Sequence, residues 1–253
     1  MKTAIHRGQR IAYDVTGDGP ALVFQHGFLS NRQSWHQSGY VAAFADAYRV
    51  ITVDSLGHGD SDKPADPALY GRAARAGDVA AVLDAEGIEK AHFIGYSMGG
   101  WISTAMLIHQ PVRLLSLVIG GWDPLGGMAS QPATAGGFDS AIDAVRAVAP
   151  QLAAWITPEV IPGLRACFEA CFETDGVEAV LRNPPVPALF WAGRDDDCFP
   201  GVRKASSATG VHLLEVPGDH LGARGKDSIP ALRAFLGRIP GQLSSDGGIR
   251  GHF

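Results

Sequence analysis

Gly95-Tyr96-Ser97-Met98-Gly99 is the stretch of sequence from which the expected fold follows. An apolar run typical of a buried strand, residues 91–95, leads into it, and a helical pattern over residues 100–107 follows at once. A serine at the apex of so sharp a turn needs small residues two positions to either side, which glycine supplies without a Cβ clash. The turn holds the hydroxyl outward over the positive end of the helix, a geometry suited to a nucleophile.

Short apolar runs alternate with helical patterns along the rest of the chain, which is typical of a mostly parallel sheet covered on both faces. Strands are expected at residues 2–6, 10–16, 21–25, 49–53, 91–95, 114–120, 188–192 and 212–216. Helices are expected at residues 32–47, 70–87, 98–109, 201–208 and 228–236. The predicted fold is therefore α/β, with an eight-stranded, mostly parallel sheet.

The long span between the sixth and seventh expected strands interrupts this alternation. A parallel crossover needs only about a dozen residues, and this span carries helical patterns of its own, near residues 142–148, 151–156 and 164–172. We expect an α/β core of residues 1–122 and 184–239, with residues 123–183 inserted as a helical lid over the carboxyl ends of the strands. Residues 240–253, rich in glycine and serine, are expected to form a loose tail.

A serine hydroxyl becomes a good nucleophile when a histidine takes its proton and a carboxylate orients that histidine. The sequence supplies both groups after later strands. Three consecutive aspartates, residues 195–197, follow the seventh expected strand, and His220 follows the eighth. The other histidines have no comparable context, so His220 is the candidate base.

The order serine, aspartate, histidine on successive loops resembles the α/β-hydrolase fold superfamily, in its carboxylesterase-like serine hydrolase branch. Residues 25–28, residues 54–61, the turn around Ser97 and the two later loops carry the resemblance, which extends over about residues 10 to 237. It implies that the triad acid lies three residues after a glycine and four before a proline, which selects Asp196. Asp123, after the sixth strand, is the alternative acid, because some relatives use that loop.

The resemblance also implies an oxyanion hole, in which two backbone N–H groups face the oxygen that becomes negative. Met98 follows the nucleophile and supplies one donor, and Phe28 supplies the second. Phe28 and Trp122 are the expected substrate-binding residues, and Trp155 and Phe168 of the lid are further pocket candidates. Plain packing is the alternative for Trp122, Trp155 and Phe168. His26 is expected to hold the Phe28 loop by hydrogen bonding.

These residues predict a serine hydrolase that cleaves a small or medium carboxylic ester through an acyl-enzyme. The same triad would also serve a carbon–carbon bond hydrolase of the meta-cleavage type, a perhydrolase or an acyltransferase. Serine at the turn, where epoxide- and halide-displacing relatives have aspartate, argues against those two reactions. A small-molecule receptor that kept its triad is the non-enzyme alternative.

The composition of the chain limits which binding partners and which cellular compartment are expected. The net charge is −5, no basic run occurs, and no apolar run reaches the roughly 18 residues of a membrane span, so neither nucleic acid nor membrane insertion is expected. The start of the chain suggests no secretion signal, and the three cysteines suggest no disulfide framework, so a cytoplasmic location is expected. The absence of metal and nucleotide motifs predicts neither cofactor nor metal. Oligomeric state stays open.

Overall fold

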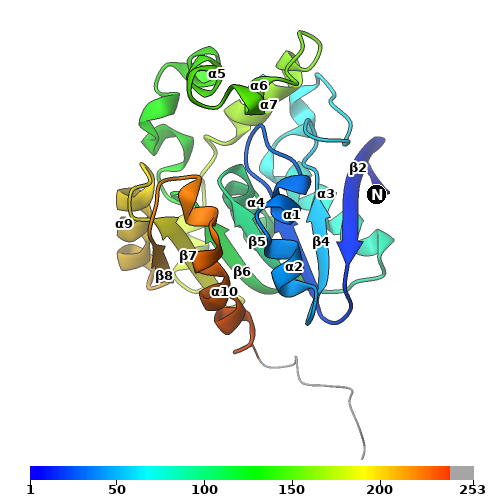
Figure 1. The fold of residues 1–253 in the computed structure, drawn as a ribbon, viewed down its shortest axis with the longest axis vertical. Helices are drawn as coiled ribbons and strands as arrows, with labels where there is room; N and C mark the ends of the chain where they lie inside the picture. The colour runs from blue at the N-terminus through cyan, green and yellow to red at the C-terminus, as the bar shows by residue number, and fades with distance from the viewer. Residues whose placement is uncertain (240–253) are drawn as a thin grey trace, which may run out of the picture.

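The computed structural model describes residues 1–239, and its centre is an eight-stranded sheet with the order β1-β2-β4-β3-β5-β6-β7-β8 (Figure 1). The strands are β1 (Lys2–His6), β2 (Gln9–Thr16), β3 (Ala21–Gln25), β4 (Arg49–Val53), β5 (Ala91–Tyr96), β6 (Leu114–Gly120), β7 (Ala188–Gly193) and β8 (His212–Val216). β2 pairs antiparallel with β1 and β4, and every pairing from β4 to β8 is parallel. The predicted sheet is confirmed, with each strand within one residue of its expected bounds.

Helices cover both faces of the sheet. Outside residues 121–187, the described helices are α1 (Gln33–Gln37), α2 (Tyr40–Phe44), α3 (Arg72–Ala85), α4 (Met98–His109), α9 (Phe199–Thr209) and α10 (Ile229–Leu236). Short 3-10 turns lie at η1 (Pro67–Leu69), η2 (Pro111–Arg113), η5 (Gly222–Arg224) and η6 (Lys226–Ser228). The prediction that helices cover both faces of the sheet is confirmed.

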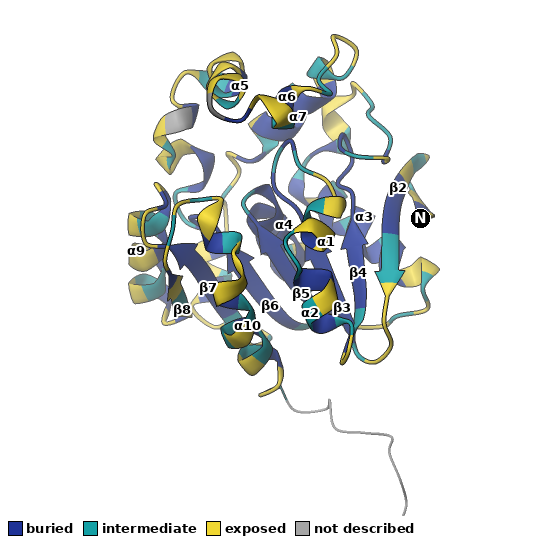
Figure 2. Ribbon diagram, viewed as in Figure 1, coloured by how far each residue is buried: buried dark blue, intermediate teal, exposed yellow. Residues whose placement is uncertain are grey.

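Two apolar clusters form the core, one on each side of the sheet. Val23 of β3 packs in the first cluster with Trp101 of α4, and its neighbour Phe24 packs in the second with Phe44 of α2. Successive strand residues point to opposite faces, so one apolar run supplies both clusters. Figure 2 shows the result: buried strands lie between helices whose outer surfaces are exposed.

A helical segment, residues 121–187, connects β6 to β7. It contains η3 (Gly127–Ser130), η4 (Pro132–Thr134), α5 (Gly137–Val148), α6 (Pro150–Ala153), α7 (Ile161–Ala170) and α8 (Val177–Leu181). In Figure 1, α5, α6 and α7 lie together at the top of the view, above the sheet. The segment therefore faces the loops that follow the parallel strands.

One expected helix is wrong. Residues 32–47 form two short helices, α1 and α2, because Gly39 between them has a φ of 83°, which an α-helix cannot contain. The tail predicted at residues 240–253 lies outside the described residues. Within residues 1–239, no helix has the length and apolar character needed to cross a bilayer.

Candidate active site

Ser97 lies at the junction of β5 and α4, where its backbone has a φ of 59° and a ψ of −120°. A positive φ is costly for a residue with a Cβ, so the surrounding structure must hold it. The turn is tight enough that a Cβ on Gly95 would lie 1.9 Å from the carbonyl oxygen of Gly99, and a Cβ on Gly99 would lie 2.1 Å from that of Gln25. The Ser97 N–H donates to the Gly120 carbonyl at 2.8 Å, which ties the turn to β6.

Asp196 and His220, from the loops after β7 and β8, are joined by a hydrogen bond of 2.7 Å between Oδ2 and Nδ1. The other Asp196 oxygen accepts the Cys198 N–H at 3.1 Å. Burial alone would raise the pKa of Asp196, but its hydrogen bond and charge interaction with His220 outweigh burial and keep that pKa below its ordinary value. An ionised carboxylate only accepts hydrogen bonds, so Nδ1 carries the proton and Nε2 is the basic nitrogen.

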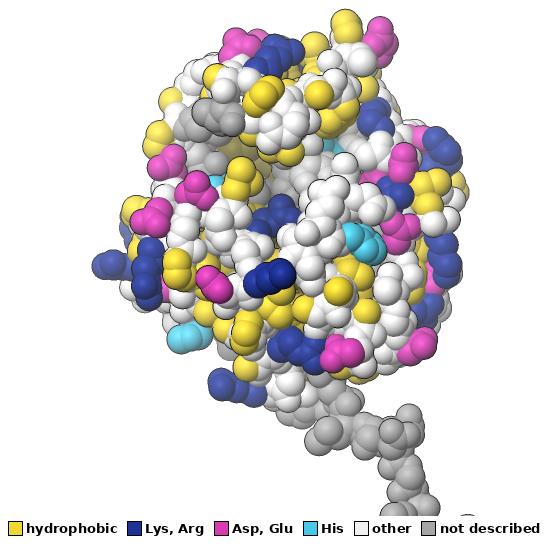
Figure 3. Space-filling view, in the orientation of Figure 1, with side chains coloured by type: hydrophobic (Ala, Val, Ile, Leu, Met, Phe, Trp, Pro, Cys, Tyr) yellow, Lys and Arg dark blue, Asp and Glu magenta, His cyan; other side chains and the backbone are white. Residues whose placement is uncertain are grey.

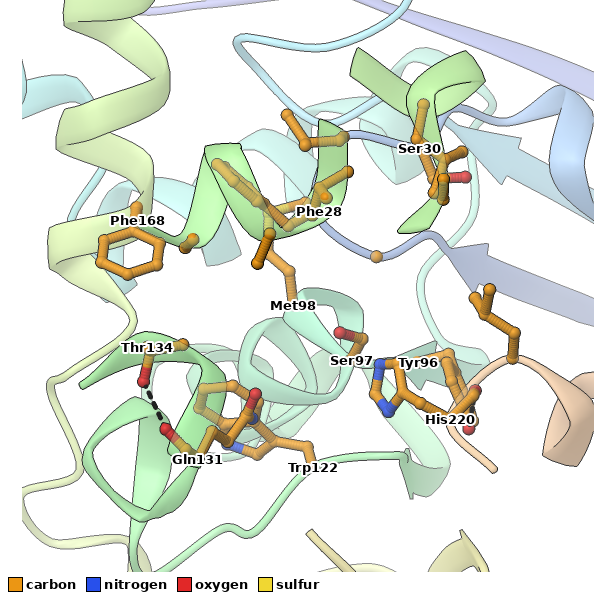
Figure 4. Close-up of a pocket in the computed structure, with 18 of the residues that line it drawn as sticks. Phe28, Ser30, Tyr96, Ser97, Met98, Trp122, Gln131, Thr134, Phe168 and His220 are labelled. Carbon is orange, nitrogen blue, oxygen red and sulfur yellow. Dashed lines mark hydrogen bonds between the residues drawn. The ribbon is translucent and has the colours of Figure 1, made fainter. Parts of the chain in front are cut away.

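The His220 imidazole faces the Ser97 side chain, and both residues line the same cavity (Figure 4). Tyr96, the residue before the serine, holds the histidine loop: its hydroxyl donates to the His220 carbonyl at 2.7 Å. The structure therefore brings Ser97, Asp196 and His220 to the same end of the sheet.

Asp123, the alternative acid, has different partners. Its Oδ1 accepts the backbone N–H groups of Leu125 at 3.0 Å and Gly126 at 2.9 Å. These bonds close the turn after β6, the usual role of an aspartate at a turn start. The geometry favours Asp196 as the partner of the histidine.

Phe28 and Met98 line the same cavity as the serine. Phe28 lies in the turn after β3, which is closed by the Ser30 N–H donating to Gly27 at 3.2 Å, and no backbone hydrogen bond of the described residues uses the Phe28 N–H. Met98 is in the first turn of α4, where N–H groups lack partners within the helix. A Cβ on Gly27 would lie 3.1 Å from the Ser97 Cβ, so the Phe28 turn passes directly beside the serine.

His26 holds this turn, as expected. Its Nε2 accepts the Ser55 N–H at 3.0 Å, and its Nδ1 is 2.8 Å from the Gly27 carbonyl oxygen. Burial lowers the pKa of His26 to about 4, so the ring is neutral near pH 7. With Nε2 accepting, Nδ1 donates, and the imidazole bridges the loops after β3 and β4.

The cavity beside Ser97 has a volume of about 410 Å³ and mainly apolar walls. Phe28 and Trp122 contribute to it from the core, and Phe168 and Val145 from the helical segment. Figure 4 shows Phe28, Trp122 and Phe168 in the part of the cavity that extends to one side of the serine, and Figure 3 shows the hollow beneath the helical segment. Such a space accommodates a small or medium apolar molecule.

Trp155, another pocket candidate, does not line this cavity. Its indole N–H donates to the Leu29 carbonyl at 3.2 Å, and its ring centroid lies 5.8 Å from that of His58. Leu29 has a φ of 60° and lies next to Phe28. Trp155 therefore ties the helical segment to the strained turn beside the serine.

Asp196, Cys198 and His220 also place potential metal-ligand atoms within 4.8 Å of one another. Burial and the neighbouring Asp196 charge raise the pKa of the Cys198 thiol, whereas a metal takes the thiolate. The Asp196 and His220 atoms are already hydrogen-bonded to each other. The donor set fits a hydrogen-bonded pair better than a metal centre.

Sequence reasoning identified Ser97 and His220 but missed other polar residues of the cavity. Ser34, Gln131, Thr134 and Arg224 line it from α1, the helical segment and η5. Ser34, Gln131 and Thr134 lie in no motif, and only the folded chain brings them together. Arg224 had one signal, its position four residues after His220 in the same loop.

A model of the alpha/beta hydrolase fold family matches residues 20–139. The chain is 31% identical over 204 residues to 3-oxoadipate enol-lactonase 2 of Acinetobacter baylyi, covering 71% of this chain and 72% of the relative. It is 33% identical over 113 residues to a putative 2-succinyl-6-hydroxy-2,4-cyclohexadiene-1-carboxylate synthase of Bacillus subtilis, covering 43% of this chain but only 40% of that relative. The second match thus spans less than half of the relative's length.

The crystal structure of an enol-lactonase from Burkholderia xenovorans superposes with a TM-score of 0.76 and 22% identity, covering 94% of this chain and 100% of that chain. At this identity the likeness concerns the fold. The sequence relatives carry out different reactions by name, so the reaction of this chain must be argued from its own site.

Proposed function

Because the chain belongs to the α/β-hydrolase fold family, we propose that it is a serine hydrolase that cleaves a carboxylic ester through an acyl-enzyme. The observation that carries the proposal is the 2.7 Å hydrogen bond between Asp196 and His220, which fixes an imidazole facing Ser97 at the wall of a cavity. Ser97 is the nucleophile, His220 the general base and acid, and Asp196 the residue that orients His220.

In the first half-reaction, the Ser97 oxygen attacks the ester carbonyl carbon while His220 Nε2 takes the hydroxyl proton. The tetrahedral intermediate collapses, the bond to the alcohol oxygen breaks, and His220 returns its proton to that oxygen. In the second half-reaction, water attacks the acyl-serine, again with His220 as base. The carboxylic acid leaves and the Ser97 hydroxyl is restored.

The Phe28 and Met98 N–H groups are the proposed oxyanion hole. The Phe28 N–H makes no backbone hydrogen bond within the described residues, and the Met98 N–H is in the first turn of a helix. Both can therefore donate to a developing negative charge. Each such donor is worth about 10²–10³ in rate. Phe28 and Trp122, on the cavity wall, are the proposed contacts for the apolar part of the substrate.

A cyclic ester also fits this proposal. The relative from Acinetobacter baylyi is an enol-lactonase by name, and a lactone is an ester closed into a ring. A cavity of about 410 Å³ has room for a substrate of this size. We therefore include lactones in the proposed substrate class.

Residues 123–183 are the proposed lid over a core of residues 1–122 and 184–239. Phe168 and Val145 of this segment line the cavity opposite the core, and Trp155 hydrogen-bonds to the turn beside the serine. A segment placed in this way would exclude water from the acyl-enzyme and shape the pocket.

The proposal is tested by turnover of a panel of p-nitrophenyl esters, lactones and dienone acids. We expect multiple turnovers of at least one ester or lactone, and a loss of about 10⁴ or more in kcat for Ser97→Ala with an unchanged circular dichroism spectrum. Ser207→Ala, on the exposed surface of α9, is the matched control and should retain full activity.

The panel also separates the alternatives. Cleavage of dienone acids alone would replace ester hydrolysis by carbon–carbon bond hydrolysis with the same residues. Binding of these compounds without turnover would point to a receptor. Either result would overturn the proposed ester hydrolase.

A further inference from the structure

Arg224 is the only Lys or Arg among the described residues that line the cavity, and no Asp or Glu lines it. The residue ends η5, in the loop that carries His220. Figure 3 shows Lys or Arg atoms, in dark blue, inside the hollow beneath the helical segment. One positive charge therefore contributes to an otherwise uncharged wall near the proposed nucleophile.

The Arg224 guanidinium is held in place without a carboxylate. Its central carbon lies 4.5 Å from the Trp35 ring centroid and 5.6 Å from that of Tyr96, and its Nη2 donates to the Ser34 hydroxyl at 3.1 Å. Its Nε is buried and has no hydrogen-bond partner among residues 1–239. Burial lowers the pKa of Arg224, but arginine stays charged in proteins.

Arg224 is half-buried, and the more deeply buried arginines of the described residues are paired with carboxylates. The guanidinium of Arg72 lies 3.0 Å from Glu173 and that of Arg75 lies 3.0 Å from Asp78. Arg32 likewise contacts three aspartates, at positions 14, 54 and 60. For Arg224, by contrast, no carboxylate of the described residues lies within 4.0 Å.

A buried charge is costly unless a partner compensates it. The two aromatic rings offset part of that cost through their π faces, but no carboxylate of the described residues neutralises the guanidinium. A carboxylate can accept two parallel hydrogen bonds from the planar guanidinium. Because no acidic residue of the described part of the chain lines the cavity, no like charge there would repel such a group.

We propose that Arg224 binds a carboxylate group carried by the substrate, so that the enzyme acts on anionic esters or lactones in preference to neutral ones. This inference rests on the proposed hydrolase function and adds the charge of the substrate to it. Arg224 is then a specificity-determining residue, and the apolar wall contacts the chain between the carboxylate and the reacting carbonyl.

The test compares matched pairs of esters. In one series, p-nitrophenyl hemiesters of glutarate and adipate are compared with the same esters carrying a carboxamide in place of the free carboxylate. In the other, esters of glycolate and 3-hydroxypropionate are compared with those of the corresponding hydroxyamides. We expect the wild type to favour the anion by at least about 10-fold in kcat/KM in at least one pair, the usual size of a charge-assisted hydrogen bond.

Arg224→Gln should lower this anion-to-amide ratio by about 10- to 100-fold, and Arg224→Lys should retain part of it. Arg203→Gln, on the exposed surface of α9, is the control and should leave the ratio unchanged. Thermal melts establish that each variant is folded. If Arg224→Gln does not fold, the inference is tested by the anion-to-amide ratios of the wild type and of Arg224→Lys.

A ratio near one in every pair for the wild type, or a ratio that Arg224→Gln leaves unchanged, would overturn the inference. Calorimetric titration with glutarate separates it from the function. If no ester is turned over but glutarate binds and Arg224→Gln abolishes binding, the carboxylate site stands and the hydrolase proposal fails. If neutral esters are turned over and glutarate does not bind, the hydrolase proposal stands and the carboxylate site fails.

Discussion

Asp196 is one of three consecutive aspartates, and its environment separates it from the other two. Asp196 is 5% exposed and its carboxylate is hydrogen-bonded to His220, whereas Asp195 and Asp197 are exposed on the loop surface. Burial disfavours an isolated carboxylate, so the histidine and the Cys198 N–H must compensate it. In return, the ionised oxygen fixes which imidazole nitrogen is basic.

The choice of acid gives the first prediction at this scale. Asp196→Asn should lower kcat by about 10⁴, because the amide would favour the wrong histidine tautomer. Asp123→Asn should change kcat by less than about 10-fold, because its Oδ1 can still accept the two turn N–H groups. Steady-state kinetics on the best ester measures both, and the reverse result would transfer the role to Asp123.

Sequence reasoning reached the proposed catalytic residues because each lies in the turn or loop after a strand and carries recognisable chemistry. Spacing to Gly193 and Pro200 selected Asp196 only through the family resemblance. Arg224 was not identified as a site residue, and Trp155 was expected in the pocket but instead hydrogen-bonds to the Leu29 turn. Their roles depend on side-chain contacts with Trp35 and Leu29, which lie far away in the sequence.

At the scale of elements, the turn from β5 to α4 is the most constrained part of the chain. Ser97 can hold a positive φ there because Gly95 and Gly99, which have no Cβ, let the backbones of β5, α4 and the end of β3 pack closely together. The strain of the serine is thus compensated by close packing of three backbone segments.

Gly99→Ala tests this packing. The added Cβ would lie 2.1 Å from the Gln25 carbonyl oxygen, so we expect a loss of about 2 kcal/mol or more in unfolding free energy. Gly71→Ala is the control, because a Cβ there would meet no atom within 4 Å, and should cost less than about 1 kcal/mol. Chemical denaturation measures both, and equal effects would contradict the steric account.

Sequence predicted the strands well because each is a short buried apolar run between turn residues. Helices were harder where packing rather than periodicity decides. The expected helix at residues 32–47 divides at Gly39, so that Trp35 of α1 and Tyr40 of α2 reach the same core cluster. The hydrophobic periodicity of these residues does not predict that the helix is interrupted at Gly39.

At the scale of the whole molecule, three fully buried histidines make folding depend on pH. Burial lowers the pKa of His26 and of His92 to about 4, and lowers that of His58 well below its ordinary value. In the unfolded chain each titrates near 6.5. Between about pH 6.5 and pH 4 the unfolded state therefore binds more protons, and stability falls as the pH falls.

We expect the contribution of these histidines to the unfolding free energy to be fully present above pH 6.5. Below pH 6.5 each histidine should lower the unfolding free energy by up to about 1.4 kcal/mol per pH unit. Denaturant titrations at pH 8, 7, 6 and 5 measure the slope. His92→Gln should reduce it by about one histidine's share, and the exposed control His212→Gln should not. A slope that His92→Gln leaves unchanged would contradict this assignment.

The central claim is that the Ser97 hydroxyl attacks the substrate with His220 as its base. Mass spectrometry after incubation with a fluorophosphonate, which reacts with activated serines, tests it most directly. We predict one adduct, located on the peptide that contains Ser97, absent in Ser97→Ala and formed far more slowly in His220→Ala. An adduct on another residue, or none in a protein that hydrolyses esters, would contradict it.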